Sequence, residues 1–120
     1  MKDKFYVPFQ IAEMLKEKGY PQDFAHNDAL YTLPKGELYW ALDVDIARRR
    51  SEGEPILAPT YLDVLDWFEE KGIMIGTDYY FETERWRVEI NSRFDYHFAG
   101  NFYHRDEALN EAIIYALTII

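Results

Sequence analysis

The sequence contains no cysteine and only two serines, Ser51 and Ser92. The missing cysteine excludes disulfide bridges, zinc-thiolate centres and cysteine nucleophiles. Serine nucleophiles lack support as well, because neither serine stands in the sharp strand-to-helix turn that exposes such a residue. Glycine-rich phosphate loops are also absent. We therefore expect no cofactor and no catalytic residues, and a binding role in preference to an enzymatic one.

No apolar run approaches the roughly 18 residues of a membrane-spanning helix, and the first residues lack the apolar core of a signal peptide. A cytoplasmic protein without membrane contact is the expectation. Basic residues are scarce, since 13 stand against 22 acidic ones and the net charge is −9. Such a surface repels phosphate backbones. We therefore expect no nucleic-acid partner, whereas a basic protein partner is compatible with the charge.

Helix and strand periodicities predict a single α+β domain over residues 1–120, in the order α-β-β-α-β-β-β-α. The first two helices should end at Gly19 and Gly72, in the left-handed position after the last turn. The closing helix, 105–120, carries a broad apolar stripe: Ala108, Leu109, Ala112, Ile113, Ala116, Leu117 and Ile120. One antiparallel sheet with helices packed on one face would bury that stripe.

The expected strands cover 29–33, 37–42 and an antiparallel meander over 77–102. In the second strand, Leu38, Trp40 and Leu42 should form a buried face. A two-residue turn at Glu84-Arg85 would pair side chains across the meander as follows: Phe81 with Val88, Tyr79 with Ile90, and Glu82 with Arg87. Residues 99–101 contain a glycine inside a strand pattern and should form a bulge or a bend.

Residues 43–58 are the expected mobile loop, because charged residues, Gly53 and Pro55 interrupt any periodicity. Arg48, Arg49 and Arg50 form the basic cluster of the chain. They could contact an anion or an acidic partner, or they could offset the neighbouring carboxylates.

Two carboxylates of the same segment, Asp43 and Asp45, would share a strand face if the preceding strand continues. They are the weak candidates for a metal or ligand site. The spacing of His97 and the other histidines matches no metal motif, so we predict no metal ligand beyond this weak pair.

Aromatic residues make up 18% of the chain, including 10 tyrosines and 3 tryptophans. Five fall outside the expected buried stripes: Tyr39, Trp67, Tyr80, Tyr96 and Tyr103. Tyrosine and tryptophan are favoured anchors of protein interfaces. These five form the predicted interaction surface, and the alternative is that they cover a second face of the core.

The second half of the chain, a helix, three strands and a helix, has the order of a double-stranded-RNA-binding domain. Such domains need basic residues where the last helix begins. Here Arg105 is followed by Asp106 and Glu107, which is the wrong charge for a phosphate groove. The order alone therefore does not indicate RNA binding.

A set of helix caps and core positions forms the following motifs: Ala58-Pro59-Thr60-Tyr61, Val64, Trp67-Phe68, Lys71-Gly72-Ile73, Glu107-Ala108-Leu109 and Ala112-Ile113. On these motifs the chain resembles short, functionally uncharacterised proteins of gut Bacteroides genomes and their prophages or conjugative elements. The resemblance covers most of the chain, from Val7-Pro8-Phe9 onward. It implies a mobile-element context and no activity.

Together these features predict a non-catalytic protein-binding module of a bacterial or phage mobile element. It would act through an acidic, aromatic-bearing surface, and one version of this hypothesis is an inhibitor of a basic partner. The alternative is a small ligand- or metal-binding domain, or an enzyme, with an acidic cleft near Asp43 and Asp45. A third interpretation is a homodimer formed through a free sheet edge or through Ile119-Ile120.

Overall fold

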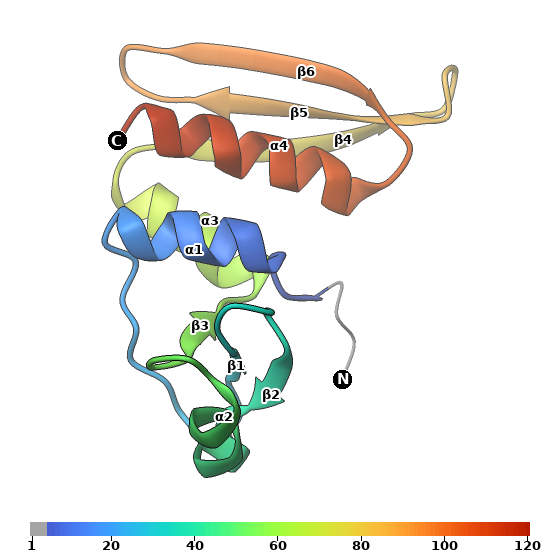
Figure 1. Cartoon of the computed structure of the whole chain (residues 1–120). Helices are drawn as coiled ribbons and strands as arrows, with labels where there is room; N and C mark the ends of the chain where they lie inside the picture. Colours follow the sequence, from blue (N-terminus) through green and yellow to red (C-terminus); the bar gives the residue numbers. More distant parts are fainter. Residues whose placement is uncertain (1–4) are drawn as a thin grey trace. The chain divides into compact units, whose positions relative to one another are not determined.

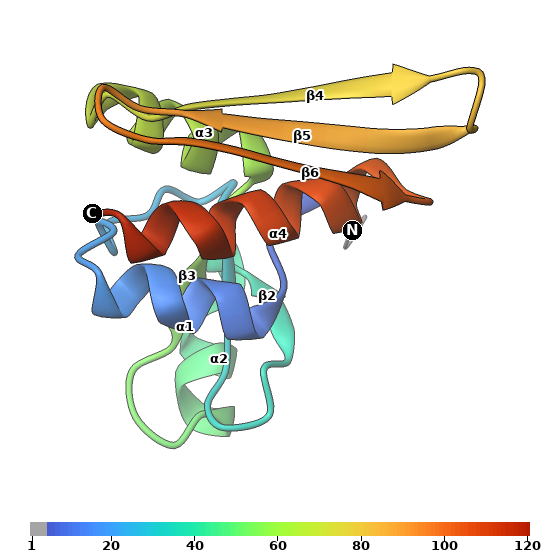
Figure 2. The same cartoon turned by 90° about the horizontal axis from the view of Figure 1, so that it is seen from above.

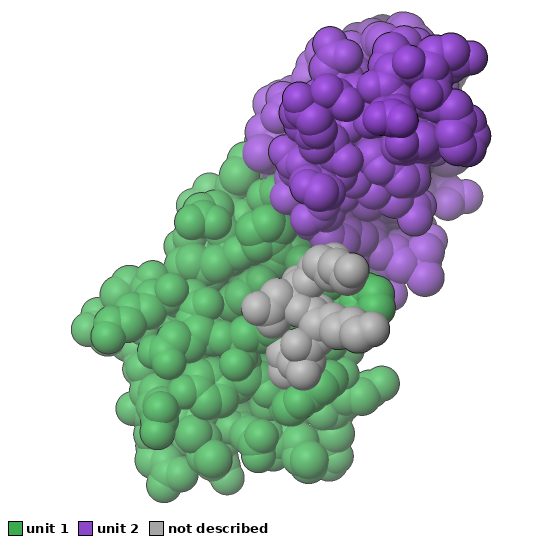
Figure 3. Space-filling model, turned by 90° about the vertical axis from the view of Figure 1, so that its right-hand side faces the viewer, with its two compact units in different colours: residues 1–60 green, residues 61–120 purple. Residues whose placement is uncertain are grey.

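The computed structural model describes residues 5–120, and the chain divides into two compact units, Met1–Thr60 and Tyr61–Ile120 (Figure 3). Each unit contains helices and one three-stranded antiparallel sheet (Figure 1). The α+β class is therefore confirmed. The described part of the chain has one helix and one strand more than expected, and two sheets replace the single sheet.

Unit 1 (Met1–Thr60) contains a sheet in the order β2-β1-β3. Its elements are α1 (Phe9–Glu17), β1 (Ala29–Tyr31), β2 (Leu38–Trp40), the short 3-10 helix η2 (Ala41–Asp43), α2 (Val44–Arg50) and β3 (Ile56–Ala58). Helix α1 ends as predicted: Gly19 has φ 94°, and the N–H of Tyr20 donates to the carbonyl of Leu15 at 2.9 Å. This bond closes a Schellman motif.

The segment expected to be a loop, residues 43–58, contains helix α2 and strand β3, and only residues 51–55 lack regular structure. The loop assignment is therefore wrong for most of the segment. Ala47 is the only buried residue of α2, so this helix leaves no apolar stripe in the sequence. Strand β3 is too short to show an alternation, yet it pairs with the whole of β1.

The face expected to be buried in the second strand is only half-buried at Leu38 and is exposed at its other two residues. Trp40 is 40% exposed and Leu42 is 68% exposed, whereas Ala41 between them is buried. The strand stops at Trp40, and η2 begins at the next residue. The expected alternation is wrong here because a helical turn rotates successive side chains by about 100–120° instead of 180°.

Unit 2 (Tyr61–Ile120) consists of α3 (Tyr61–Glu70), β4 (Met74–Tyr80), β5 (Arg85–Asn91), β6 (Tyr96–Phe102) and α4 (Arg105–Thr118). The sheet has the order β4-β5-β6, and α4 lies along one of its faces (Figures 1 and 2). The apolar stripe is buried as predicted within α4, whereas Ile120 lies beyond the last residue of the helix and is 40% exposed.

Helix α3 also ends as its sequence predicts. Gly72 has φ 82°, and the N–H of Ile73 donates to the carbonyl of Phe68 at 3.0 Å. The side chains of Phe68 and Ile73 are both buried. This helix end is a second Schellman motif.

The hairpin of β4 and β5 has a different register from the predicted one. Tyr79 lies opposite Trp86 and Thr77 lies opposite Val88. The turn takes four residues, 81–84, and Glu84 adopts φ 54°. The register differs by four residues, so the side chains of β4 and β5 stay on their expected faces. Phe81, expected opposite Val88 on the buried face, instead lies in the turn and is 84% exposed.

The predicted bulge in β6 is confirmed. Trp86 pairs with Phe102 and Val88 pairs with Ala99, so β6 carries one residue more than β5 between these pairs. Asn101 takes the left-handed conformation there, with φ 68°.

Candidate functional site

Side chains of the β4-β5-β6 sheet alternate between two faces. Val88 and Ile90 are buried beneath α4, so Arg87 and Glu89 point to the opposite side. Residues paired directly across strands share a face. No helix of unit 2 covers this side of the sheet (Figure 1). We call it the open face, and it consists of Met74, Asp78, Tyr80, Arg85, Arg87, Glu89, Tyr96, Phe98 and Tyr103.

Arg87 lies at the centre of the open face, between aromatic rings from both neighbouring strands. Its guanidinium carbon is 3.6 Å from the ring centroid of Tyr80 and 5.8 Å from that of Phe98. The arginine stem lies along Gly100, where a Cβ would come into contact with Cγ of Arg87 at 3.4 Å. Each such exposed cation–π contact is worth about 0.5–1 kcal/mol.

The same guanidinium has no hydrogen-bond or ion-pair partner within residues 5–120. The rings of Tyr80 and Phe98 therefore hold Arg87 in place and leave its N–H groups available to another molecule.

Two further contacts extend the open face to its ends. The guanidinium carbon of Arg85 lies 3.7 Å from the ring centroid of Tyr103. At the other end, the Tyr96 hydroxyl donates to Oε1 of Glu89 at 3.1 Å. Partial desolvation and this hydrogen bond raise the pKa of Tyr96, so the phenol remains a donor at neutral pH. Four large side chains are about half exposed or more: Met74 (48%), Tyr96 (58%), Phe98 (45%) and Tyr103 (65%).

The structure brings three of the five predicted aromatic residues together, namely Tyr80, Tyr96 and Tyr103. Trp67 lies on α3 instead, where Nζ of Lys71 is 4.6 Å from its ring centroid. Tyr39 belongs to β2 of unit 1. Tyr39 and Trp67 are therefore not part of the open face.

The predicted anion-binding arginines already have partners or simply face outward. Nη2 of Arg48 lies 2.9 Å from Oε1 of Glu54. Nη1 of Arg50 donates to the hydroxyl of Tyr39 at 3.2 Å. Arg49 is exposed. All three stand in the last turn of α2, where positive charge is favourable to the helix dipole.

The weak metal candidates do not share a strand face, because β2 ends before them. Asp43 closes η2 and Asp45 stands in the first turn of α2, and both are exposed. Among the described residues, no group of three or more histidine, aspartate or glutamate side chains could hold a metal ion.

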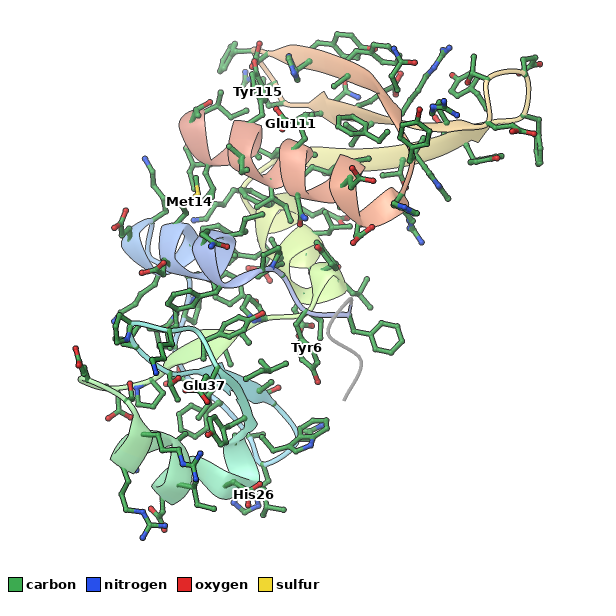
Figure 4. All side chains as sticks on the ribbon, turned by 45° about the vertical axis from the view of Figure 1, so that its right-hand side comes forward. Tyr6, Met14, His26, Glu37, Glu111 and Tyr115 are labelled. Atoms are coloured by element: carbon green, nitrogen blue, oxygen red, sulfur yellow. The ribbon has the colours of Figure 1, made fainter. Side chains whose placement is uncertain are left out.

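A second cluster joins α4 to the turn between β5 and β6. Tyr115 stands on α4 (Figure 4). Its hydroxyl donates to Oδ2 of Asp95 at 2.6 Å, and its ring stacks on His97 with centroids 3.9 Å apart. This hydrogen bond, together with partial burial and the carboxylate charge, raises the pKa of Tyr115. The cluster lies between elements of one unit and stabilises their packing.

Acidic and aromatic surfaces are separate in unit 2. The unit contains 12 acidic and 5 basic residues, a net charge of −7, whereas the open face carries two of each and is neutral. Most of the excess lies on the two helices, at Asp63, Asp66, Glu69, Glu70, Asp106, Glu107 and Glu111. The expected surface was both acidic and aromatic, and the structure divides these properties between neighbouring elements.

The sequence did not single out Arg87 or Phe98. Arg87 was expected in an ion pair with Glu82, which the true register makes impossible. Phe98 follows Tyr96 by two residues in the same strand, and that spacing could have marked the two rings as neighbours on one face.

No family model, curated protein or solved structure matches this chain. Among the described residues, no helix is long and apolar enough to cross a membrane. The open face offers tyrosine, phenylalanine and arginine side chains, which are typical of contact surfaces between proteins.

Proposed function

We propose that this protein is a non-catalytic protein-binding module of a bacterial or phage mobile element, and that the open face is its contact surface. One observation carries the proposal: Tyr80, Arg87 and Phe98 stack across three strands on a sheet face that no element of unit 2 covers. Tyrosine and arginine are enriched among the residues that dominate binding energy. Stacking fixes their side chains before binding and so reduces the entropy lost on association.

The charge of unit 2 indicates the kind of partner. A net charge of −7 attracts a basic protein over a range of about 10 Å at moderate salt. The open face itself is neutral, so contact there depends on aromatic burial and on the N–H groups of Arg87. A fitting partner therefore has an apolar patch surrounded by basic residues. Inhibition of such a partner is the specific version of this proposal.

Affinity capture with two matched double variants tests the open face. Tyr96→Ser with Phe98→Ser removes two rings that are 58% and 45% exposed, so the fold should tolerate it. The control, Leu62→Ser with Phe94→Ser, removes two side chains that are 68% and 90% exposed and lie outside the open face.

A partner captured from nuclease-treated lysate by the wild type and the control, but not by the open-face variant, is the expected result. Equal capture by both variants would refute the open face as the contact surface. Capture that depends on intact nucleic acid would refute a direct protein partner.

A further inference from the structure

Strand β4 is an edge strand without the usual protection against pairing. The order β4-β5-β6 leaves β4 and β6 at the two edges. A bulge interrupts β6, and bulges are one of the features that blunt an edge. By contrast, β4 pairs regularly over seven residues, contains no proline or lysine, and has Asp78 as its single charge.

The outward backbone groups of β4 are available to another strand. Within residues 5–120, backbone hydrogen bonds join β4 to β5 and to no other element. Met74 is 48% exposed and Tyr79 is 38% exposed. Figure 2 shows β4 along one side of the sheet.

We propose that two copies of this chain associate through β4, antiparallel about a two-fold axis at Thr77. The two sheets would then form one continuous sheet of six strands. Such an interface is isologous, because the same strand contributes from both copies. This inference goes beyond the proposed function, which concerns the open face and not the edge.

The sequence of β4 is self-complementary about Thr77. The strand runs from Met74 to Tyr80, so an axis at its central residue pairs all seven positions. Met74 would lie opposite Tyr80 of the second copy, on the open-face side. Ile75 would lie opposite Tyr79 of the second copy, on the other side. Both are pairs of an aromatic ring with a large apolar side chain, which stabilise neighbouring strands.

Charge selects the same register. With the axis at Thr77, Asp78 lies opposite Gly76 of the second copy, and no like charges meet. A shift by two residues in one direction would place Asp78 opposite Asp78 of the second copy. A shift in the other direction would leave Tyr79 and Tyr80 without partners. Shifts by an odd number would turn the open faces of the two copies to opposite sides.

Thr77 itself suits the axis position. Its hydroxyl oxygen accepts a hydrogen bond from Nε of Arg105 at 3.2 Å. The hydroxyl proton therefore remains available to Thr77 of the second copy. Directly opposed threonines form one of the favourable cross-strand pairs.

The dimer would also change how the open face works. Because the register keeps both open faces on the same side, two neutral aromatic surfaces would lie next to each other. A partner with two matching patches, or a dimeric partner, could then bind both surfaces at once and gain avidity.

Cross-linking tests the axis directly, because the chain contains no cysteine. Thr77→Cys introduces one thiol per chain, and residues opposed across antiparallel strands have Cα atoms about 4.5–5.5 Å apart, within the range of a disulfide. We expect a covalent dimer on mild oxidation of the full chain. The control, Thr83→Cys, places the thiol in the exposed four-residue turn. Equal cross-linking of the two variants would overturn the proposal.

Sedimentation velocity with charge variants tests the register. No atom lies within 4 Å of a Cβ built on Gly76, so this position accepts side chains. Gly76→Asp would face Asp78 of the second copy and should weaken the dimer at least tenfold. Gly76→Lys should strengthen it, and Gly76→Asp with Asp78→Lys should restore it.

Equal dimer dissociation constants for Gly76→Asp and Gly76→Lys would overturn the proposed dimer. A wild type that is monomeric at every concentration would overturn it as well. The open-face variant, Tyr96→Ser with Phe98→Ser, should still dimerise. The two proposals can therefore fail independently. If the open-face variant still dimerises and still captures the partner, the open-face proposal is wrong and the dimer proposal stands.

Discussion

The substitution Gly36→Ala gives a sharp test of the packing in unit 1. Gly36 has φ 73°, and a Cβ there would lie 2.5 Å from Cγ of Phe9. The ring of Phe9 cannot easily retreat, because its centroid is 5.5 Å from that of Tyr31 in an edge-to-face contact. Tyr31 is fixed in turn by the hydrogen bond that its hydroxyl donates to the carbonyl of Val7 at 2.6 Å.

The expected loss of stability for Gly36→Ala has three contributions. A non-glycine residue in the left-handed region costs about 1–2 kcal/mol. Overlap with a packed side chain costs about 1–3 kcal/mol. Alanine also restricts the unfolded chain, which returns about 0.4–1 kcal/mol. We expect the free energy of unfolding to fall by about 2–4 kcal/mol.

Gly19→Ala is the matched control in the same unit. Gly19 has φ 94°, but no atom lies within 4 Å of the position that a Cβ would take there. Only the backbone contributions remain, so we expect a fall of about 1 kcal/mol. Urea denaturation followed by far-UV circular dichroism measures both values.

A double-mutant cycle with Phe9→Ala separates the overlap from the backbone effect, because alanine lacks the Cγ and ring atoms that lie nearest to a Cβ on Gly36. If Phe9 is the obstacle, the loss caused by Gly36→Ala should be smaller when alanine replaces Phe9, with a coupling of about 1 kcal/mol or more. The reasoning fails if Gly36→Ala costs no more than Gly19→Ala, or if the two substitutions are strictly additive.

Two further predictions concern unit 2. Glu84→Gly should raise the free energy of unfolding by about 0.5–1 kcal/mol in urea denaturation, because Glu84 adopts φ 54°. Thr83→Gly in the same turn should lower the free energy of unfolding. A loss of stability for Glu84→Gly with a gain for Thr83→Gly would contradict the left-handed conformation of Glu84. The raised pKa of Tyr115 means that the folded state holds the phenol proton more tightly than the unfolded state, so its stabilisation is complete below pH 10 and is lost as the pH rises through the raised pKa. Urea midpoints should therefore fall less steeply above pH 10 for Tyr115→Phe than for the wild type, and identical slopes would count against the hydrogen bond to Asp95.

Local sequence signals predicted the features that depend on single residues. Gly19 and Gly72 mark helix ends, because glycine enters the left-handed region without a steric penalty. The bulge near Asn101 follows from a glycine and an asparagine inside a strand pattern. The stripe of α4 repeats over three turns, so one exposed residue at its end does not obscure it.

The hairpin register could not be predicted in the same way. Alternation has a period of two, so it is identical for registers that differ by four residues. Only the turn distinguishes them, and its left-handed position holds Glu84 instead of the usual glycine or asparagine. Helix α2 was missed for a related reason, because a helix that buries only Ala47 has no apolar period to detect.

The same limit explains why the centre of the open face was not predicted. Alternation alone places Tyr80 and Tyr96 on the face of the sheet opposite the core, and the structure has them there. The position of Arg87 between Tyr80 and Phe98 depends on which residues of three strands lie side by side. In the expected register, Arg87 would have formed an ordinary ion pair with Glu82.

The separation of charge from aromatic surface bears on how unit 2 would recognise a partner. If the acids surrounded the rings, each contact would require removing water from carboxylates, which is costly unless every charge is paired. With the acids on α3 and α4, the net charge of −7 would still attract a basic partner from a distance. The proposed contact surface, the open face, carries only two acidic and two basic residues, and Arg87 and Glu89 already have aromatic neighbours. Attraction and contact thus depend on different residues, so the rate of association and the lifetime of the complex can be altered independently.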